Sequence, residues 1–127
     1  MVPESQTQHM QFMYDDKLMT DVWFNYHTNY IRVVNHSDDW RNLFFGRKNP
    51  DEITLADLDY VLEDHCIPRS RANVKEYLHN IGLDVYDPLA IVHITHGFVA
   101  NCKEWIRFDD DPSYICLQYL DDHFGHE

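Results

Sequence analysis

The sequence has 127 residues, of which 44% are hydrophobic and 25% are charged, a composition typical of one globular domain. Its apolar runs are far shorter than the roughly 20 residues that a membrane span requires, and the basic and apolar stretches of a signal peptide are missing. Three cysteines without CxxC spacing predict reduced thiols rather than a disulfide framework. We therefore expect a cytoplasmic protein.

Acidic residues outnumber basic residues by 22 to 10, which gives a formal net charge of −12. The imbalance is strongest in residues 109–127, which contain no lysine or arginine. A negative field repels phosphate backbones, so direct binding to DNA or RNA is disfavoured. The same field attracts positively charged protein surfaces, including the grooves in which nucleases hold nucleic acid. Solubility alone is the simpler interpretation of this charge.

Alternation of apolar and polar residues predicts strands near the N-terminus. After a flexible leader at residues 1–9, this alternation covers residues 10–14, 19–26 and 30–34, with turn residues between the segments. We expect an antiparallel meander of about three strands. Its apolar face needs a cover, because a small isolated meander is barely stable in water.

Helical spacing and capping residues predict four or five short helices after the meander. The first is expected over residues 37–45 and ends before Gly46. The second begins at Thr54, where Asp57 would complete a capping box, and it ends at Pro68.

Two further helices are expected in the middle of the chain. Ser70 is predicted to cap one that ends at Gly82, a position suited to a left-handed residue. Asp87 and Pro88 are predicted to begin the next, which ends at Gly97.

The last part of the chain predicts one strand and one helix. Residues 104–108 alternate again and are expected to add a strand to the meander. The aspartates at 109–111, followed by Pro112, are predicted to end this strand and to cap a final helix. The fold class is therefore α+β, with residues 10–127 forming a single domain.

Nine histidines and three cysteines raise the question of a metal or catalytic site. His93 and His96 are spaced i, i+3, but a structural zinc site needs four ligands, and the chain has no CxxC or HExxH element. Cys66 directly follows His65, and consecutive helical side chains diverge by about 100°, so this pair does not make a nucleophile and base. We expect no enzyme and no cofactor. A small metal-dependent enzyme that uses His93, His96 and Cys102 is the minor alternative.

Aspartates and aromatic residues crowd together at the C-terminal end of the sequence. Carboxylates spaced along a helix or loop can imitate a phosphate backbone, and tyrosine and phenylalanine supply the contact area that interfaces favour. We therefore predict a partner-binding surface that consists of Asp109, Asp110, Asp111, Tyr114, Tyr119, Asp121, Asp122 and Phe124. A solvated tail with a helix cap is the alternative.

A second acidic patch is predicted on the helix after Thr54, and its members are Asp57, Asp59, Glu63 and Asp64. A solvated helix face is the alternative there. Arg69 and Arg71 bracket Ser70 in the turn that follows this helix. Ion pairing that holds the turn is expected, with contact to a small anion as the alternative.

A resemblance covers about two fifths of the chain, between residues 58 and 108. It rests on CIPRSRAN at 66–73, LHNIGL at 78–83, YDP at 86–88, THG at 95–97 and EWIRF at 104–108. These motifs resemble small uncharacterised proteins of bacterial mobile elements and prophages and, more distantly, a segment ahead of the kinase core in HipA-like proteins. They are packing and turn residues, and none of the kinase machinery is present, so the resemblance implies no kinase activity.

A mobile-element source favours one function among those that the charge allows. Small acidic proteins of such elements include anti-CRISPR and anti-restriction proteins, so the resemblance implies by association an inhibitor of a host nucleic-acid-processing enzyme. This inhibitor would occupy the basic groove of a protein partner such as a CRISPR effector or another nuclease, without direct contact to nucleic acid or membrane. The alternative is a regulatory protein-binding module of a toxin–antitoxin or mobilisation system, which would bind through its sheet and apolar surface.

Overall fold

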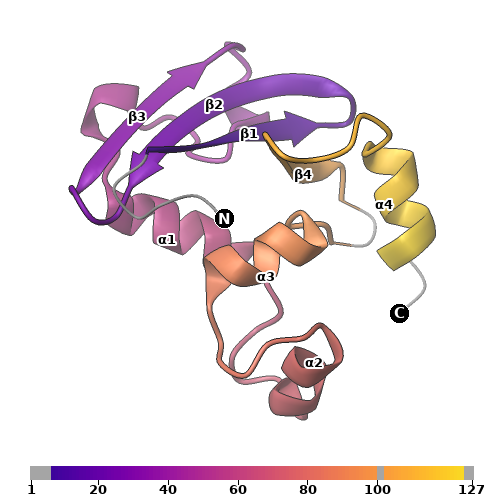
Figure 1. The fold of residues 1–127 in the computed structure, drawn as a ribbon. Helices are drawn as coiled ribbons and strands as arrows, with labels where there is room; N and C mark the ends of the chain where they lie inside the picture. The colour runs from indigo at the N-terminus through magenta and orange to yellow at the C-terminus, as the bar shows by residue number, and fades with distance from the viewer. Residues whose placement is uncertain (1–6, 100–101, 125–127) are drawn as a thin grey trace.

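The computed structural model describes residues 7–99 and 102–124, apart from the side chain of Phe124. In chain order its elements are β1 (Gln8–Tyr14), β2 (Lys17–Asn25), β3 (Tyr30–Asn35), the short 3-10 turns η1 (Trp40–Asn42) and η2 (Pro50–Glu52), α1 (Leu55–Asp64), α2 (Val74–Asn80), α3 (Pro88–Thr95), β4 (Glu104–Phe108) and α4 (Leu117–Phe124). This is the predicted α+β class, with an antiparallel sheet and helices (Figure 1). None of the described helices is long and apolar enough to cross a bilayer.

The strands form one sheet in the order β3-β2-β1-β4. Tight turns join β1 to β2 and β2 to β3, and their residues Asp15 and Asn29 have positive φ angles of 55° and 56°. β4 returns from the other end of the chain to pair antiparallel with β1, with Phe108 opposite Met10. The predicted meander and the added strand at 104–108 are both confirmed, and β1 becomes a central strand.

Helices α1 and α3 cover one face of the sheet (Figure 1). Leu58, Val61 and Leu62 are buried on α1 at helical spacing, and Val92 of α3 joins them in the core. Each strand contributes alternate residues, because successive side chains of a strand point to opposite faces. The buried residues from the four strands are Met10, Phe12, Val22, Phe24, Val33, Ile106 and Phe108.

The fourth helix packs on part of the opposite face, beside β1 and β4. Leu120 of α4 joins Met13, Trp105 and Ile115 in a second buried cluster. The indole N–H of Trp105 donates a hydrogen bond to the backbone carbonyl of Asp15 at 2.6 Å, which ties this cluster to the β1–β2 turn. We call the remainder of this face, which faces away from α1 and α3, the outer face.

The prediction of a helix over residues 37–45 is wrong. Only Trp40–Asn42 form a 3-10 turn, after which Leu43 is extended and residues 44–47 form turns. Phe44 and Phe45 then both pack on the ring of Phe12, at centroid distances of 4.2 and 5.5 Å. Consecutive side chains of an α-helix diverge by about 100°, so an irregular segment places both rings on the sheet better than a helix does.

The predicted caps of two helices are confirmed. Thr54 and Asp57 form the capping box of α1, since the Asp57 N–H donates to Thr54 Oγ1 at 3.2 Å and the Thr54 N–H donates to Asp57 Oδ2 at 2.8 Å. Asp87 caps α3 by accepting a hydrogen bond from the Leu89 N–H at 3.2 Å. Gly97 follows α3, as predicted, and Gly82 has a φ of 87° after α2, which confirms the left-handed residue predicted there.

Two other predicted caps are wrong. Ser70 does not cap the helix predicted after it, because that helix, α2, begins after Asn73, whose φ is 64°. The aspartate run does not cap the last helix, which begins only at Leu117. Instead Asp111 Oδ2 accepts a hydrogen bond from the Phe108 N–H at 2.8 Å and closes a turn after β4. Aspartate binds backbone N–H groups in turns as well as at helix ends, so the capping signal alone does not distinguish the two.

The predicted leader at residues 1–9 does not extend to residue 9, because β1 begins at Gln8. β1 already includes Gln8 and His9, which pair with Phe24 and Trp23 of β2. Residues 1–6 lie outside the described part of the chain.

Candidate functional site

A cluster of polar side chains from all four strands or their ends meets on the outer face. The carboxylate of Asp21 on β2 lies 2.7 Å from His9 Nε2 on β1 and 2.6 Å from His36 Nε2, just after β3. The other ring nitrogen of His9 lies 2.6 Å from Asp109 Oδ1, just after β4. Gln11 Nε2 donates a further hydrogen bond to Asp21 at 3.1 Å. We call these five residues the Asp21 cluster.

The geometry of the Asp21 cluster favours its charged form. His9 has a carboxylate at each ring nitrogen, and only the imidazolium can donate to both. Burial alone would lower the pKa of His9, but the hydrogen bonds and charges of Asp21 and Asp109 outweigh it and raise the pKa above its usual 6.5. Burial alone would raise the pKa of Asp21, but hydrogen bonds from His36 and His9 lower it below its usual value. The cluster is therefore a network of ion pairs that links the four strands.

The carboxylate of Asp21 orients the imidazole rings of His9 and His36. Among the described residues, no hydroxyl or thiol makes a hydrogen bond to His9, Asp21, His36 or Asp109. A histidine–carboxylate pair becomes a catalytic base when it activates a nucleophile or a substrate proton within hydrogen-bond reach. In this structure the carboxylates of Asp21 and Asp109 occupy the two ring nitrogens of His9.

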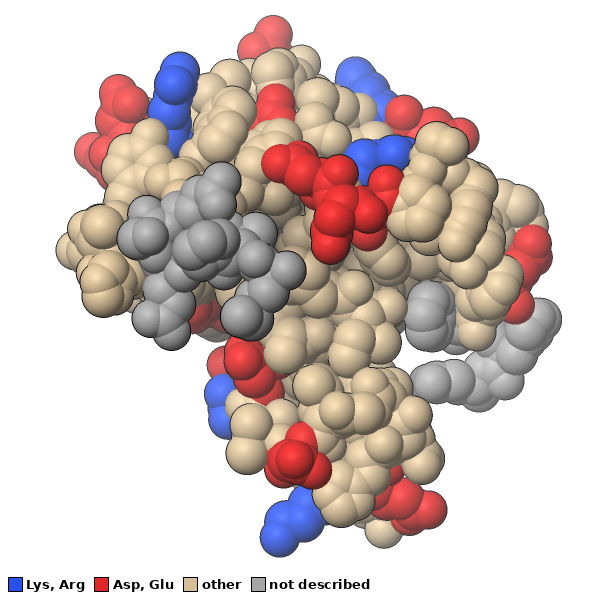
Figure 2. Space-filling model, in the orientation of Figure 1, with Lys and Arg blue, Asp and Glu red and all other residues tan. Residues whose placement is uncertain are grey.

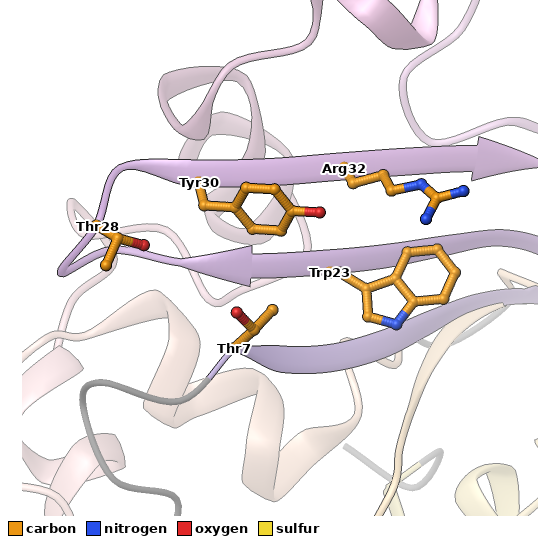
Figure 3. Close-up of a pocket in the computed structure, with 5 residues that line it drawn as sticks. All are labelled: Thr7, Trp23, Thr28, Tyr30 and Arg32. Carbon is orange, nitrogen blue, oxygen red and sulfur yellow. The ribbon is translucent and has the colours of Figure 1, made fainter.

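A shallow groove of about 490 Å³ lies next to the Asp21 cluster on the outer face (Figure 3). Its lining residues are Thr7, Trp23, Thr28, Tyr30 and Arg32. The Trp23 ring stacks on His9 with centroids 4.9 Å apart, and the Arg32 guanidinium lies 5.3 Å from the Trp23 centroid. Tyr30 is 42% exposed. Tryptophan, tyrosine and arginine are the residue types that dominate binding energy at protein interfaces, so we treat this Trp23 groove as one candidate binding surface.

The structure places the predicted C-terminal aspartates in different environments. Asp109 pairs with His9 in the Asp21 cluster. Asp111 closes the turn after β4, and its carboxylate lies 3.3 Å from His96 Nδ1 with a side-chain exposure of 11%. Asp110 is exposed. Two of the three neighbouring carboxylates are therefore held by internal contacts.

The other predicted C-terminal residues lie on α4 or just before it. Tyr114 stacks on Tyr119 at 5.1 Å, and Tyr119 stacks on His123 at 3.9 Å. Asp121 and Asp122 are exposed, and Asp122 accepts a hydrogen bond from Gln118. Positions two apart on an α-helix point about 160° away from each other, so Tyr119 and Asp121 do not share one face. The side chain of Phe124 lies outside the described part.

The tertiary structure brings two carboxylates of the β1–β2 turn close to α4, and the sequence pattern does not predict this. A groove of about 360 Å³ is lined by Asp15 and Asp16 of the β1–β2 turn and by Asp121 of α4. Lys103 is the one lysine or arginine among its lining residues, and Phe98 and Leu117 form apolar walls. We call this the acidic groove. Figure 2 shows other acidic side chains in separate groups, one of them over β4.

The second predicted acidic patch is largely engaged in internal contacts. Asp57 pairs with Lys48 at 2.9 Å in addition to capping α1, and Asp59 accepts a hydrogen bond from Tyr26 at 2.6 Å. Glu63 pairs with Arg69 at 2.7 Å, which is the expected ion pair of the turn after α1. Asp64 is exposed.

The candidate thiol and metal residues have structural contacts. The Cys66 thiol donates to the Leu62 carbonyl at 3.1 Å, and burial together with the charges of Glu63 and Asp87 raises its pKa to about 12. The described residues, which include His93, His96 and Cys102, contain no group of three or more histidine, cysteine, aspartate or glutamate side chains that could hold a metal ion.

The sequence analysis did not predict the Asp21 cluster, nor that Asp15 and Asp16 of the β1–β2 turn line the acidic groove. The outward positions of β1 and β2 do alternate as His9, Gln11, Asp21 and Trp23, which is the signal for a polar sheet face. Their contacts depend on strand register, and those of His36 and Asp109 depend on the order of all four strands.

Comparison with protein-family models, with curated proteins and with solved structures finds no match to this chain. The acidic groove and the Trp23 groove are therefore the basis for a functional assignment.

Proposed function

We propose that this protein is a non-enzymatic, cytoplasmic binding protein that docks a basic protein surface through the acidic groove. The observation that supports this is the convergence of Asp15, Asp16 and Asp121 from opposite ends of the chain around a single Lys103. Like charges held together strengthen the local negative potential, which a complementary cationic partner relieves. The apolar walls of Phe98 and Leu117 supply contact area that can be desolvated.

The partner class follows from the charge of the whole chain. A net charge of −12 suits the cationic groove of a nuclease, such as a CRISPR effector or a restriction enzyme, whose nucleic acid the protein would displace. The resemblance to proteins of phages and other mobile elements supports an anti-CRISPR or anti-restriction role. Asp110 and Asp122 are exposed but do not line the groove, and Asp109 and Asp111 are held by internal contacts, so Asp121 is the predicted C-terminal aspartate that the groove uses.

A pair of charge-reversal variants tests this function. The first carries Asp15→Lys, Asp16→Lys and Asp121→Lys in the acidic groove. The matched control carries Asp38→Lys, Glu52→Lys and Asp84→Lys at exposed positions elsewhere. Each lysine replaces a negative by a positive charge, so three replacements add six and both variants have a net charge of −6.

The assay is DNA cleavage by a panel of purified, guide-loaded CRISPR effectors and restriction endonucleases, with direct binding measured at low and high salt. We expect inhibition of at least one enzyme and an affinity that falls with salt. The groove variant should bind roughly ten- to hundredfold more weakly than the control, since exposed ion contacts contribute about 0.2–1 kcal/mol each and reversal adds repulsion. Equal losses in both variants, or no inhibition across the panel, would contradict the proposal.

The Trp23 groove favours a second candidate, a regulatory module that binds a protein partner through its sheet. Its test is a Trp23→Ala variant with Trp40→Ala as the control, because Trp40 is exposed, does not line this groove and carries its own stacked Arg47 at 3.9 Å. Binding that survives high salt, and that only Trp23→Ala removes, would assign the function to the outer face. Toxin and mobilisation proteins are the partners to assay.

A further inference from the structure

Residues between α1 and α3 form an arm that contains α2 and projects from the sheet and its covering helices (Figure 1). Side-chain contacts hold the base of this arm. The Tyr86 hydroxyl donates to the Ile67 carbonyl at 2.6 Å, which joins the outgoing and returning segments. The Arg69 guanidinium stacks on Tyr86 at 4.2 Å and pairs with Glu63 of α1 at 2.7 Å. The arm is thereby fixed relative to α1.

A recess of about 350 Å³ lies between this arm and helices α1 and α3. On the side opposite the arm, the recess is lined by two residues of α3, Ile91 and Thr95, and by His65 at the end of α1. Their side chains are almost fully buried, with exposures of 0, 7 and 8%. Phe98 and Val99, which follow α3, line it as well, and Val99 is 47% exposed. The volume falls in the range of about 300–1,000 Å³ that is common for small-molecule sites.

Most polar side chains that line the recess on the side opposite the arm already have hydrogen-bond partners within the protein. Thr95 Oγ1 donates to the Ile91 carbonyl at 3.1 Å, and the Cys66 thiol donates to the Leu62 carbonyl. His65 Nδ1 bonds to the Val61 carbonyl, and its Nε2 lies 3.5 Å from Glu104. The recess is therefore lined by polar groups that are already bonded and by the apolar side chains of Phe98 and Val99.

Arg71 is the exception among the lining residues. It lines the recess from the arm, and in the described part of the chain its guanidinium makes no ion pair, hydrogen bond or ring contact. The nearby arginine, Arg69, is by contrast committed to Glu63. A guanidinium presents paired N–H donors that match a carboxylate. The recess therefore combines apolar walls with one uncommitted anion-binding group.

We propose that this recess binds a small apolar monocarboxylate, of the class of a medium-chain fatty acid. The carboxylate pairs with Arg71, and the hydrocarbon packs against Phe98 and Val99. This site is independent of the acidic groove and of the function assigned to it, because the two share only the Phe98 side chain.

Calorimetric titration of the full chain with sodium octanoate tests the proposal. Sodium hexanoate probes chain length, and 1-octanol and octylammonium replace the carboxylate by a neutral and a cationic group. Octanoate should bind saturably and about fifteenfold more tightly than hexanoate, since each buried methylene adds roughly fourfold in affinity. Octanol and octylammonium should bind at least about tenfold more weakly than octanoate, because they lack the ion pair with Arg71.

Arg71→Gln should weaken octanoate binding by about tenfold or more, whereas Lys75→Gln, which removes an exposed cation of α2 outside the recess, should leave it unchanged. Arg71 is exposed and has no described partner, so its replacement should not alter thermal unfolding. The proposal is overturned if octanoate gives no saturable binding at millimolar concentration. It is also overturned if octanol or octylammonium binds as tightly, or if the two variants behave alike.

Discussion

Replacement of Asp21 by asparagine tests whether the Asp21 cluster stabilises the sheet. Asparagine keeps the shape of the side chain but removes the charge that His9 and His36 contact at 2.7 and 2.6 Å. A hydrogen bond to a charged group contributes about 1.5–3 kcal/mol when buried. The His36 contact is discounted to about 0.5 kcal/mol, because that histidine is 41% exposed. We therefore expect Asp21→Asn to lower the free energy of unfolding by about 2–3 kcal/mol.

The pH dependence of this loss makes the prediction specific. The raised pKa of His9 means that its stabilising contribution is complete below pH 6.5 and is lost as the pH rises through the folded-state pKa. The lowered pKa of Asp21 means that its contribution is present above its usual 3.8 and is lost as the pH falls through the folded-state value. The cluster should stabilise the fold most between these limits. Asp21→Asn should therefore cost most near pH 5.5 and less near pH 9, because loss of the His9 proton as the pH rises removes the ion pair with Asp21.

Urea unfolding followed by tryptophan fluorescence at the two pH values measures this difference. Asp38→Asn is the control, because Asp38 is exposed and its carboxylate has no hydrogen bond or ion pair in the described residues. Subtracting the wild-type free energy at each pH removes the titration of histidines outside the cluster. A loss below about 0.5 kcal/mol, or an equal loss at pH 5.5 and pH 9, would refute the ion-paired description of the cluster.

Three further predictions concern single residues. Thr54→Ala removes the capping box of α1 and should lower the free energy of unfolding by about 1 kcal/mol in thermal or urea unfolding, whereas Thr28→Ala in the β2–β3 turn should be neutral. Gly97→Ala should cost about 1–2 kcal/mol or more in the same assays, because φ is +64° and the new Cβ would lie 3.1 Å from Ile106 Cδ1; unchanged stability would exclude this strain. Cys66 should react slowly with a disulfide reagent at pH 8, since a pKa of about 12 leaves about one thiol in ten thousand ionised. Rapid labelling of Cys66, read by mass spectrometry after proteolysis, would contradict its burial.

The internal pairing of several aspartates changes how the acidity of this chain is to be interpreted. Asp109, Asp57 and Glu63 each contact a histidine, lysine or arginine at 2.9 Å or less, so they stabilise the fold as well as contributing to the net charge. Asp15, Asp16 and Asp121 have no such contact among the described residues. Unpaired carboxylates project the stronger field, and three of them gather at the acidic groove.

The local sequence predicts the elements whose signals come from neighbouring residues. Alternation identifies the strands, because successive side chains of a strand point to opposite faces whatever the fold around them. The Thr54–Asp57 box and the Asp87–Pro88 pair identify two helix starts, because a cap is a contact within one turn of chain. The α+β class follows from these elements taken together.

Local signals fail where distant groups compete for the same residues. Phe44 and Phe45 would fit a helix, but both rings pack on Phe12 of β1 and the segment is irregular. Asp111 would suit a helix cap, but it closes a turn after β4 beside His96. In each case the tertiary contact outweighs a helical preference of only a fraction of a kcal/mol per residue, about 0–0.7 for ordinary residues.

The strands, two capped helices and the excess of acid were determined by the sequence alone, because each depends on composition or on residues a few positions apart. The candidate sites were decided by tertiary structure. His9 meets Asp109 only because β4 pairs with β1, and Asp15 meets Asp121 only because α4 packs beside the β1–β2 turn. Strand order and helix docking join residues about a hundred positions apart, and no local pattern of side chains encodes which of them come into contact.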